Sequence, residues 1–336
     1  MSYTVRYSKQ PYTVDQKRRL QDLYLNNGGK NSEAWYQWLF NSSFSKISVR
    51  TYFLLYKTEI VGFGSLVLKP FGGLIIGSLV NFLVDEKHRT LGPAIMLQKG
   101  IIKDIENQMI CDICCALPNK KAFMIFKRAG YEPANAAIRY VLVINPLNYF
   151  KRLRFLQYYS DIFFSVIQRL GFAIKNITID VKFPGCNLSN FHILDKQDKS
   201  SLKISDYLNW RYFESYKYEY KIFSFKYNNG KPVDAFIVFH IEGNILMIDD
   251  IAHLEPSIYE KAITRFIYQV LKQYSLSSIS INSVSHKEFY RTLSDIGFFK
   301  RFEINRRVLM RVFNQNISNQ TISSFSFTMQ ESYLDI

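Results

Sequence analysis

The chain has 336 residues, a formal net charge of +15 and a hydrophobic content of 48%. This length and apolar content suit two folded domains, and the positive charge favours anionic partners: a phosphate-bearing cofactor, a nucleic acid or an anionic membrane surface. No apolar run is long enough to cross a bilayer, and the first residues hold no signal-peptide core, which argues against a membrane-spanning or secreted protein. We therefore expect a cytoplasmic location.

The cysteine pattern argues against both a disulfide framework and a zinc site. Cys111, Cys114 and Cys115 lie together in an apolar run that is typical of a strand, and no second Cys/His pair stands at zinc spacing. We expect buried thiols in a reducing compartment and no metal.

The first half alternates short strands and helices. Hydrophobic spacing predicts a strand at 4–7, helices at 15–26 and 32–40, and strands at 49–56 and 60–68. A further apolar run, 79–84, reads as a strand buried on both faces.

The stretch after that central strand has the chemistry of an anion site. A charged turn leads to Arg89-Thr90-Leu91-Gly92-Pro93-Ala94, and a helix follows. Pro93 suits a first helical turn, and Gly92 allows a ligand to approach the backbone. Free N–H groups and the helix dipole there attract an anion such as a pyrophosphate.

The order R-x-x-G-x-A between a strand and a helix resembles the acetyl-CoA loop of the GNAT N-acetyltransferase superfamily. A second segment agrees with it: after a strand at 110–117, residues Pro118, Asn119, Ala122, Gly130 and Tyr131 match the family's P-N–helix–G-[FY] pattern. The closing strand is predicted at 136–143. By themselves, the residues leave Asn119 open between a helix N-cap and a hydrogen-bonding partner of the cofactor.

The resemblance implies acetyl-CoA, or another acyl-CoA, as co-substrate. The strands splay beside the loop in this fold, and the pantetheine arm lies between them. The cofactor-binding residues that it implies are Phe82, Leu83, Val84, Arg89, Thr90, Leu91, Gly92, Pro93, Ala94, Asn119 and Phe126.

The catalytic groups are less well defined. Where the family often has a tyrosine that protonates the leaving thiolate, this chain has Phe126, which we expect to pack in the core. Tyr131 and Tyr140 are candidates to take over the role of that proton donor. A carboxylate must take the proton of the acceptor amine, and the candidates are Asp85, Asp249 and Asp250. For each of these residues a structural role is the simpler interpretation.

The second half repeats the order of the first without sequence identity. Strands are predicted at 222–227, 235–241, 244–251 and 278–282, helices at 260–274 and 287–296, and a closing strand at 303–312. In place of the phosphate loop it has His253-Leu254-Glu255-Pro256-Ser257, whose carboxylate would repel phosphates. We expect that only the first half binds CoA.

The predicted fold is therefore α/β, with two tandem GNAT folds of mixed sheets flanked by helices, the second copy degenerate. The predicted organisation is an acyl-CoA-binding domain at 1–146, a basic amphipathic helical linker at 147–190, the degenerate domain at 191–313 and a flexible tail at 314–336. Residues 147–170 interleave basic and aromatic side chains. This pattern is typical of a linker packed against a domain, or of a helix that lies on a membrane surface, which here would be the inner membrane.

These features resemble the tandem GNAT proteins of bacterial exopolysaccharide and capsule genes, with Trp210-Arg211-Tyr212 as part of the likeness. The resemblance implies N-acyl transfer to a small-molecule or sugar amine. The alternatives are a FemABX-like transferase that uses aminoacyl-tRNA and a non-catalytic, CoA-binding or membrane-docked assembly protein. The charge is spread along the chain without a recognition motif, so no specific nucleic acid is expected. The oligomeric state stays open.

Overall fold

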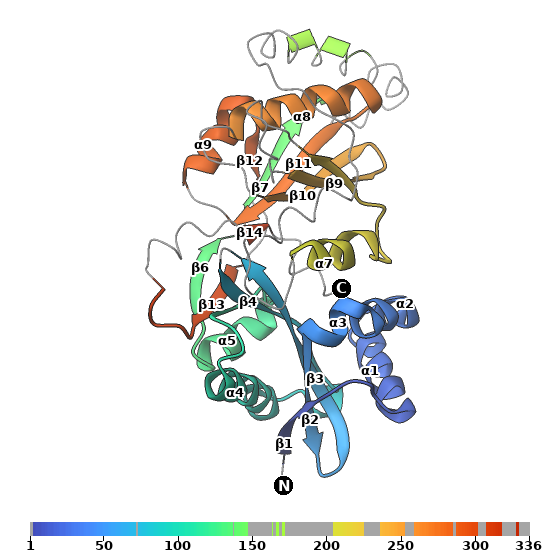
Figure 1. Ribbon diagram of the computed structural model, residues 1–336, viewed down its shortest axis with the longest axis vertical. Coiled ribbons are helices and arrows are strands. Elements are labelled where there is room, and N and C mark those ends of the chain that lie inside the picture. Colours follow the sequence, from blue (N-terminus) through green and yellow to red (C-terminus); the bar gives the residue numbers. More distant parts are fainter. Residues whose placement is uncertain are drawn as a thin grey trace.

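We describe a computed structural model of the chain. It covers residues 3–71, 73–136, 138–146, 204–224, 236–252, 259–284, 287–301, 307–317 and 327–328, with Phe163, Val166, Ile167, Leu170 and Gly171. Two mixed sheets lie one above the other along the long axis of the molecule (Figure 1). The α/β class predicted from the sequence is confirmed.

The first sheet has the order β1-β2-β3-β4-β5-β13-β6. Antiparallel pairing joins β1 through β4, and β4 runs parallel to β5. The strands are β1 (Tyr3–Ser8), β2 (Val49–Tyr56), β3 (Glu59–Phe71), β4 (Leu74–Val84), β5 (Ile113–Ala116), β6 (Glu132–Ala136) and β13 (Arg307–Val312).

Helices cover both faces of this sheet. On one side lie α1 (Val14–Asn26), α2 (Ser32–Tyr36), the π-helical turn η1 (Gln37–Asn41) and α3 (Ser43–Ser48), and on the other α4 (Leu91–Gln108) and α5 (Lys120–Arg128) (Figure 1). The sequence predicts one continuous helix at 32–40, but the structure ends the α-helix at Tyr36 and continues it as a π-helical turn. Thr13 and Gln16 form a capping box at the start of α1.

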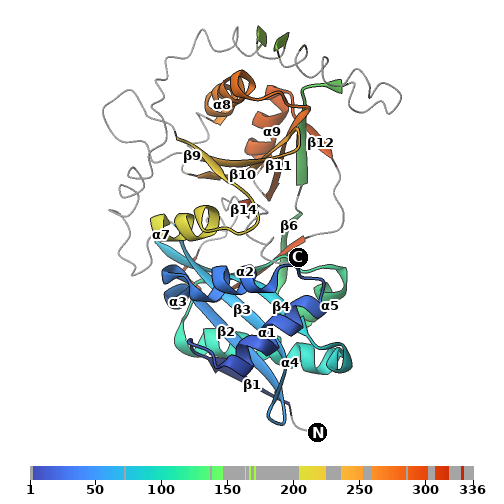
Figure 2. The same ribbon diagram turned by 90° about the vertical axis from the view of Figure 1, so that its right-hand side faces the viewer.

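The second sheet has the order β12-β7-β11-β10-β9-β8, and β14 pairs with β11 beside that path. Helices α8 and α9 cover its outer face, while α7 lies on the side of the first sheet (Figure 2). The elements are β7 (Ile138–Val143), α7 (Ile204–Leu208), the π-helical turn η6 (Asn209–Phe213), β8 (Lys221–Ser224), β9 (Phe236–Glu242), β10 (Ile245–Ala252), α8 (Tyr259–Gln273), β11 (Ser278–Val284), α9 (Lys287–Ile296), β12 (Phe299–Arg301) and β14 (Phe327–Thr328).

The two halves exchange a strand. The strand predicted at 136–143 to close the first half is almost entirely β7, which inserts between β11 and β12 of the second sheet, while β6 just before it stays in the first. Reciprocally, β13 of the second half inserts between β5 and β6 of the first. Each sheet is therefore completed by the other half of the chain.

Aromatic packing joins the halves. The indole rings of Trp38 on η1 and Trp210 on η6 stack at 4.7 Å, and the hydroxyl groups of Tyr24 and Tyr216 lie 3.2 Å apart. Trp210 and Tyr212 share one buried cluster with the first half, while α8 and the strands beneath it form a second core.

Other predictions meet different outcomes. Cys111, Cys114 and Cys115 are free and buried, as expected. Within 314–336, predicted to be a flexible tail, Phe327–Thr328 pairs with β11, so this part of the tail is held in the sheet. Most of the linker 147–190 and the segment 253–257 lie outside the described residues. Among the described helices, none combines the length and the apolar character that a membrane crossing requires.

Candidate active site

A gap opens between β4 and β5 of the first sheet. The two strands pair only at Ile76–Ser78 and Ile113–Cys115, and β4 continues to Val84 without β5 beside it. A bulge further bends β4 near Asn81, which has a positive φ of 52° and interrupts the pairing with β3. The end of the pairing with β5 agrees with the splayed strands that the sequence resemblance implies, and Phe82, Leu83 and Val84 lie on the stretch of β4 that has β3 but not β5 beside it.

The N-terminus of α4 lies directly after this gap and is suited to an anion. Its N-cap, Thr90, makes no side-chain capping bond, and the first turn contains no acidic residue. A Cβ atom added at Gly92 would meet no atom within 4 Å, so the space beside its backbone is open. Leu91 and Gly92 are exposed, while Pro93 and Ala94 are buried. Uncapped N–H groups and the helix dipole are chemically suited to an anion at this end of the helix.

Arg89 anchors the loop as well as adding charge. Its side chain donates hydrogen bonds to the Val84 carbonyl at 3.3 and 3.2 Å and to Oδ1 of Asn27 at 2.9 Å. The residue is nevertheless exposed. Its guanidinium therefore connects the end of β4 to the end of α1 and still faces solvent, where it can bind an anion.

Asp85 is held in place by other protein groups. Its carboxylate accepts from the Lys87 backbone N–H at 3.1 Å and from Arg19 at 2.7 Å. Partial burial acts to raise the pKa of Asp85, but these two hydrogen bonds outweigh it and leave that pKa below its usual value. A carboxylate stabilised in its charged form is a weak base, so the geometry gives Asp85 a structural task.

Asn119 is the N-cap of α5, where its Oδ1 accepts from the Ala122 backbone N–H at 2.9 Å. Its Nδ2 makes no hydrogen bond to the described residues. The two interpretations of Asn119 are thus compatible, because the oxygen caps the helix and the exposed nitrogen can donate to a ligand between the strands.

The position of the expected acid is filled by packed aromatic rings. Phe126 is 2% exposed, and its ring lies 5.4 Å from that of Phe82 and 5.2 Å from that of Tyr131. The hydroxyl of Tyr131 lies 3.3 Å from Sγ of Cys114, and burial and the neighbouring thiols hold the pKa of Tyr131 far above its usual value. Tyr140 lies on β7 in the second sheet, stacked on Tyr290.

A buried histidine–aspartate pair occupies the second sheet. Nδ1 of His240 on β9 lies 2.6 Å from Oδ2 of Asp249 on β10, and both side chains are almost fully buried. Oδ1 of Asp249 has no hydrogen-bond partner among the described residues. Burial raises the pKa of Asp249 to about 7, and the hydrogen bond from His240 offsets this only in part.

The aspartate pair sits at the second sheet's counterpart of the β4 bulge. Pairing of β10 with β9 shifts between Ile248 and Asp250, as β4 shifts against β3. Asp250 accepts from the hydroxyl of Tyr212 at 3.0 Å, and the ring of Tyr218 stacks on His240 at 4.1 Å. His240 was not predicted, because nothing in the sequence distinguishes a lone histidine in an apolar strand until β9 and β10 are paired.

The structure therefore brings together one group of the predicted residues and separates another. The residues from Phe82 to Ala94 follow one another along the gap and the α4 N-terminus, and Phe126 contacts Phe82. Asp249 and Asp250 lie in the other sheet.

No protein-family model matches the chain, and no curated protein sequence matches it. Solved structures do. One is a conserved protein of unknown function from Enterococcus faecalis, named a probable N-acyltransferase. The two sequences are 12% identical, and the match covers 93% of this chain and 73% of that one with a TM-score of 0.60.

Two more are titled GCN5-related N-acetyltransferases. The one from Anabaena variabilis is 16% identical over 93% of this chain and 73% of that one, with a TM-score of 0.59. The one from Kribbella flavida is 13% identical over 93% and 72%, also with a TM-score of 0.59. Identities this low establish the fold alone. The chain has the fold of the GNAT N-acetyltransferases, built as two mixed sheets that exchange a strand.

Proposed function

We propose that the chain is an acyl-CoA-dependent N-acyltransferase whose first half binds the acyl-CoA. The observation that carries this proposal is the gap between β4 and β5, which leads directly to the uncapped N-terminus of α4. The titles of the similar structures agree with it. Acetyl-CoA is the expected donor and a small amine the acceptor, an amino sugar of a bacterial surface polysaccharide.

Each part of this site has a chemical task. The α4 N-terminus and Arg89 hold the pyrophosphate, and Nδ2 of Asn119 donates to the pantetheine arm. Backbone N–H groups of β4 that face the gap polarise the thioester carbonyl as negative charge develops on its oxygen. The amine nitrogen then forms a bond to the carbonyl carbon, and the bond from carbon to sulfur breaks.

Two protons must move in this reaction. The amine loses one to a base, and the leaving thiolate takes one up. Among the predicted carboxylates, Asp249 has a buried oxygen without a hydrogen-bond partner in the described residues and a pKa raised by burial to about 7, which suits a base near neutral pH. Asp85 and Asp250 are engaged by Arg19 and Tyr212. We therefore favour Asp249, acting with His240, as the acceptor of the amine proton.

Calorimetric titration of acetyl-CoA tests the proposal. The wild type should bind one equivalent with a Kd in the micromolar range, about −8 kcal/mol. Gly92→Glu places a carboxylate at the phosphate site, where the open space accepts its side chain, and binding should be lost. Asn107→Glu adds the same charge at the other end of α4 and should bind as the wild type does. If the wild type gives no heat of binding, the acyl-CoA proposal is wrong.

A second candidate is a CoA-binding protein without transferase activity. It is favoured by Phe126, which is buried and cannot donate a proton, and by the absence of a carboxylate with a free oxygen among the predicted residues of the first sheet. Binding of acetyl-CoA without release of free CoA in the presence of a panel of amino sugars would support this candidate over the enzyme.

The membrane association proposed for 147–170 belongs to the same candidate. Of that segment, the described side chains Val166, Ile167 and Leu170 are exposed by 39%, 44% and 57%. Apolar side chains at this helical spacing, together with the basic residues of the segment, suit an anionic lipid surface. Sedimentation with anionic vesicles separates a membrane-docked protein from a soluble enzyme.

A further inference from the structure

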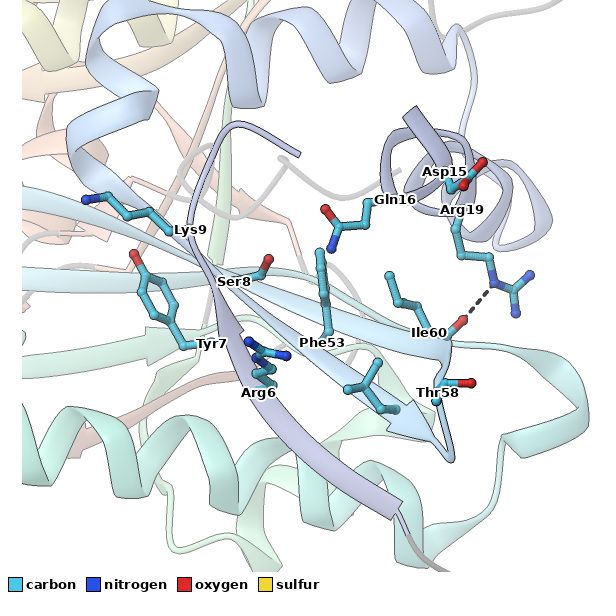
Figure 3. Close-up of a pocket in the computed structure, with 11 residues that line it drawn as sticks. Arg6, Tyr7, Ser8, Lys9, Asp15, Gln16, Arg19, Phe53, Thr58 and Ile60 are labelled. Carbon is cyan, nitrogen blue, oxygen red and sulfur yellow. Dashed lines mark hydrogen bonds between the residues drawn. The ribbon is translucent and has the colours of Figure 1, made fainter. Parts of the chain in front are cut away.

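A groove lies on the face of the first sheet that α1 covers. It has a volume of about 570 Å³ and separates α1 from the edge formed by β1 and β2. Figure 3 shows Arg6 and Ser8 of β1 on one side, Gln16 and Arg19 of α1 on the other, and Phe53 between them. The groove exists because α1 contacts β3 and β4, leaving this part of the sheet face uncovered.

Positive charge dominates the lining of the groove. Arg6, Lys9 and Arg19 line it, against a single carboxylate, Asp15. The side chains of Arg6 and Lys9 form no ion pair or hydrogen bond with the described residues, whereas Arg19 is paired. Unpaired cations in a concave site concentrate positive potential there and attract an anion.

The shape and the remaining side chains limit the size and type of that anion. Arg6 pairs in register with Phe53 on β2, so the guanidinium and the aromatic ring share one face of the sheet. Leu55 and Ile60 extend the apolar part of the lining, and Ser8, Gln16 and Thr58 add neutral hydrogen-bonding groups. The volume lies within the usual range for a small-molecule site and is too small for a polymer.

We propose that this groove binds a small anionic metabolite, with its phosphate or carboxylate group at Arg6 and Lys9 and its compact body against Phe53. A guanidinium can hold either anion through two parallel hydrogen bonds. None of the lining residues belongs to the loop from Arg89 to Ala94, so this site is separate from the proposed acyl-CoA site.

Arg19 connects the two sites. Its Nε donates to the Ile60 carbonyl at 2.7 Å, and its Nη2 donates to Asp85 at 2.7 Å. Asp85 caps the turn Glu86–His88, which leads to Arg89. The Arg19 guanidinium is thus held by Ile60, Glu59 and Asp85, which leaves Arg6 and Lys9 to bind the anion.

Calorimetry on the full chain at low salt tests the site with two probes, glucose 6-phosphate and citrate. At least one probe should bind with a Kd of about 1 mM or tighter. Arg6→Glu should weaken that binding at least about tenfold, because it reverses an exposed charge at the site. Lys9→Glu provides a second variant if Arg6→Glu does not fold.

Two controls make the result specific. Lys103→Glu makes the same change of charge at an exposed position on α4, which covers the other face of the sheet, and should leave probe binding unchanged. Gly92→Glu should also leave it unchanged, because it blocks only the proposed acyl-CoA site. The proposal is overturned if neither probe binds at about 10 mM, if Lys103→Glu weakens binding as much as Arg6→Glu does, or if Gly92→Glu removes it.

Discussion

Trp38 and Trp210 bind each other symmetrically. The indole Nε1 of each donates to the backbone carbonyl of the other at 2.8 Å, and the two rings stack within 4° of parallel. Each tryptophan is the second residue of a π-helical turn, η1 or η6. The two halves therefore contact each other through equivalent elements, and each buried indole N–H has a hydrogen-bond partner in the other half.

This relationship predicts strong coupling between the two tryptophans. In a double-mutant cycle with Trp38→Phe and Trp210→Phe, each single change removes one hydrogen bond and disturbs the stack. The coupling in the free energy of unfolding, measured with denaturant, should be about 1–3 kcal/mol. Phe266→Leu lies in the other core and should be additive with Trp38→Phe. Additivity of the tryptophan pair would contradict the prediction.

The raised pKa of Asp249 leads us to predict an unusual dependence of stability on pH. Its pKa is raised from 3.8 to about 7 in the folded protein, mainly by burial. The folded state then holds the proton more tightly than the unfolded state, so stability decreases as the pH rises from about 4 to about 7. Asp249→Asn has no charge to bury and should lose that decrease, on the order of a few kcal/mol.

Denaturant unfolding of both proteins at pH 5 and pH 8 measures this difference. Asp85→Asn is the control, because the pKa of Asp85 is lowered: its contribution is present above its unfolded pKa and lost as the pH falls further. It should therefore change stability equally at the two pH values. If Asp249→Asn and the wild type show the same dependence of stability on pH, ionisation of Asp249 does not destabilise the folded protein and the prediction is wrong.

Phe126→Tyr tests whether the missing acid can be restored at that position. Phe126 is packed between Phe82 and Tyr131 with 2% exposure, so an added hydroxyl has no water to bond. We expect the free energy of unfolding to fall by about 1–3 kcal/mol and the rate of acyl transfer not to rise. Urea unfolding and a free-thiol assay measure the two effects. A higher kcat at unchanged KM would instead make this position a proton donor.

Local patterns were enough to predict most of the elements and the central part of the candidate site. The strand β4, the loop at Arg89 and the helix α4 follow from a continuous apolar run, a glycine with proline at a helix start and regular apolar spacing. These signals act between near neighbours in the chain. Splayed strands beside β4 are implied by the resemblance, and the pairing of β4 with β5, which ends at Ser78 and Cys115, agrees with them.

Contacts between residues far apart in the chain could not be predicted from the sequence. The apolar residues of β7 would suit either sheet, so their periodicity cannot say that Tyr140 pairs with Ile281 of β11. His240 becomes notable only when β9 lies beside β10. The roles of Arg19 and Asp85 also depend on a contact between residues 66 positions apart.

The exchanged strands have a consequence for synthesis on the ribosome. The first sheet needs β13, whose Arg311 donates hydrogen bonds to the Ala129 carbonyl at 2.8 Å and to Glu106 at 2.7 Å. Until Val312 has emerged, β5 and β6 are separated by a vacant position, and each presents an unpaired edge to other nascent chains. The half that carries the proposed acyl-CoA site is thus translated early and completed late.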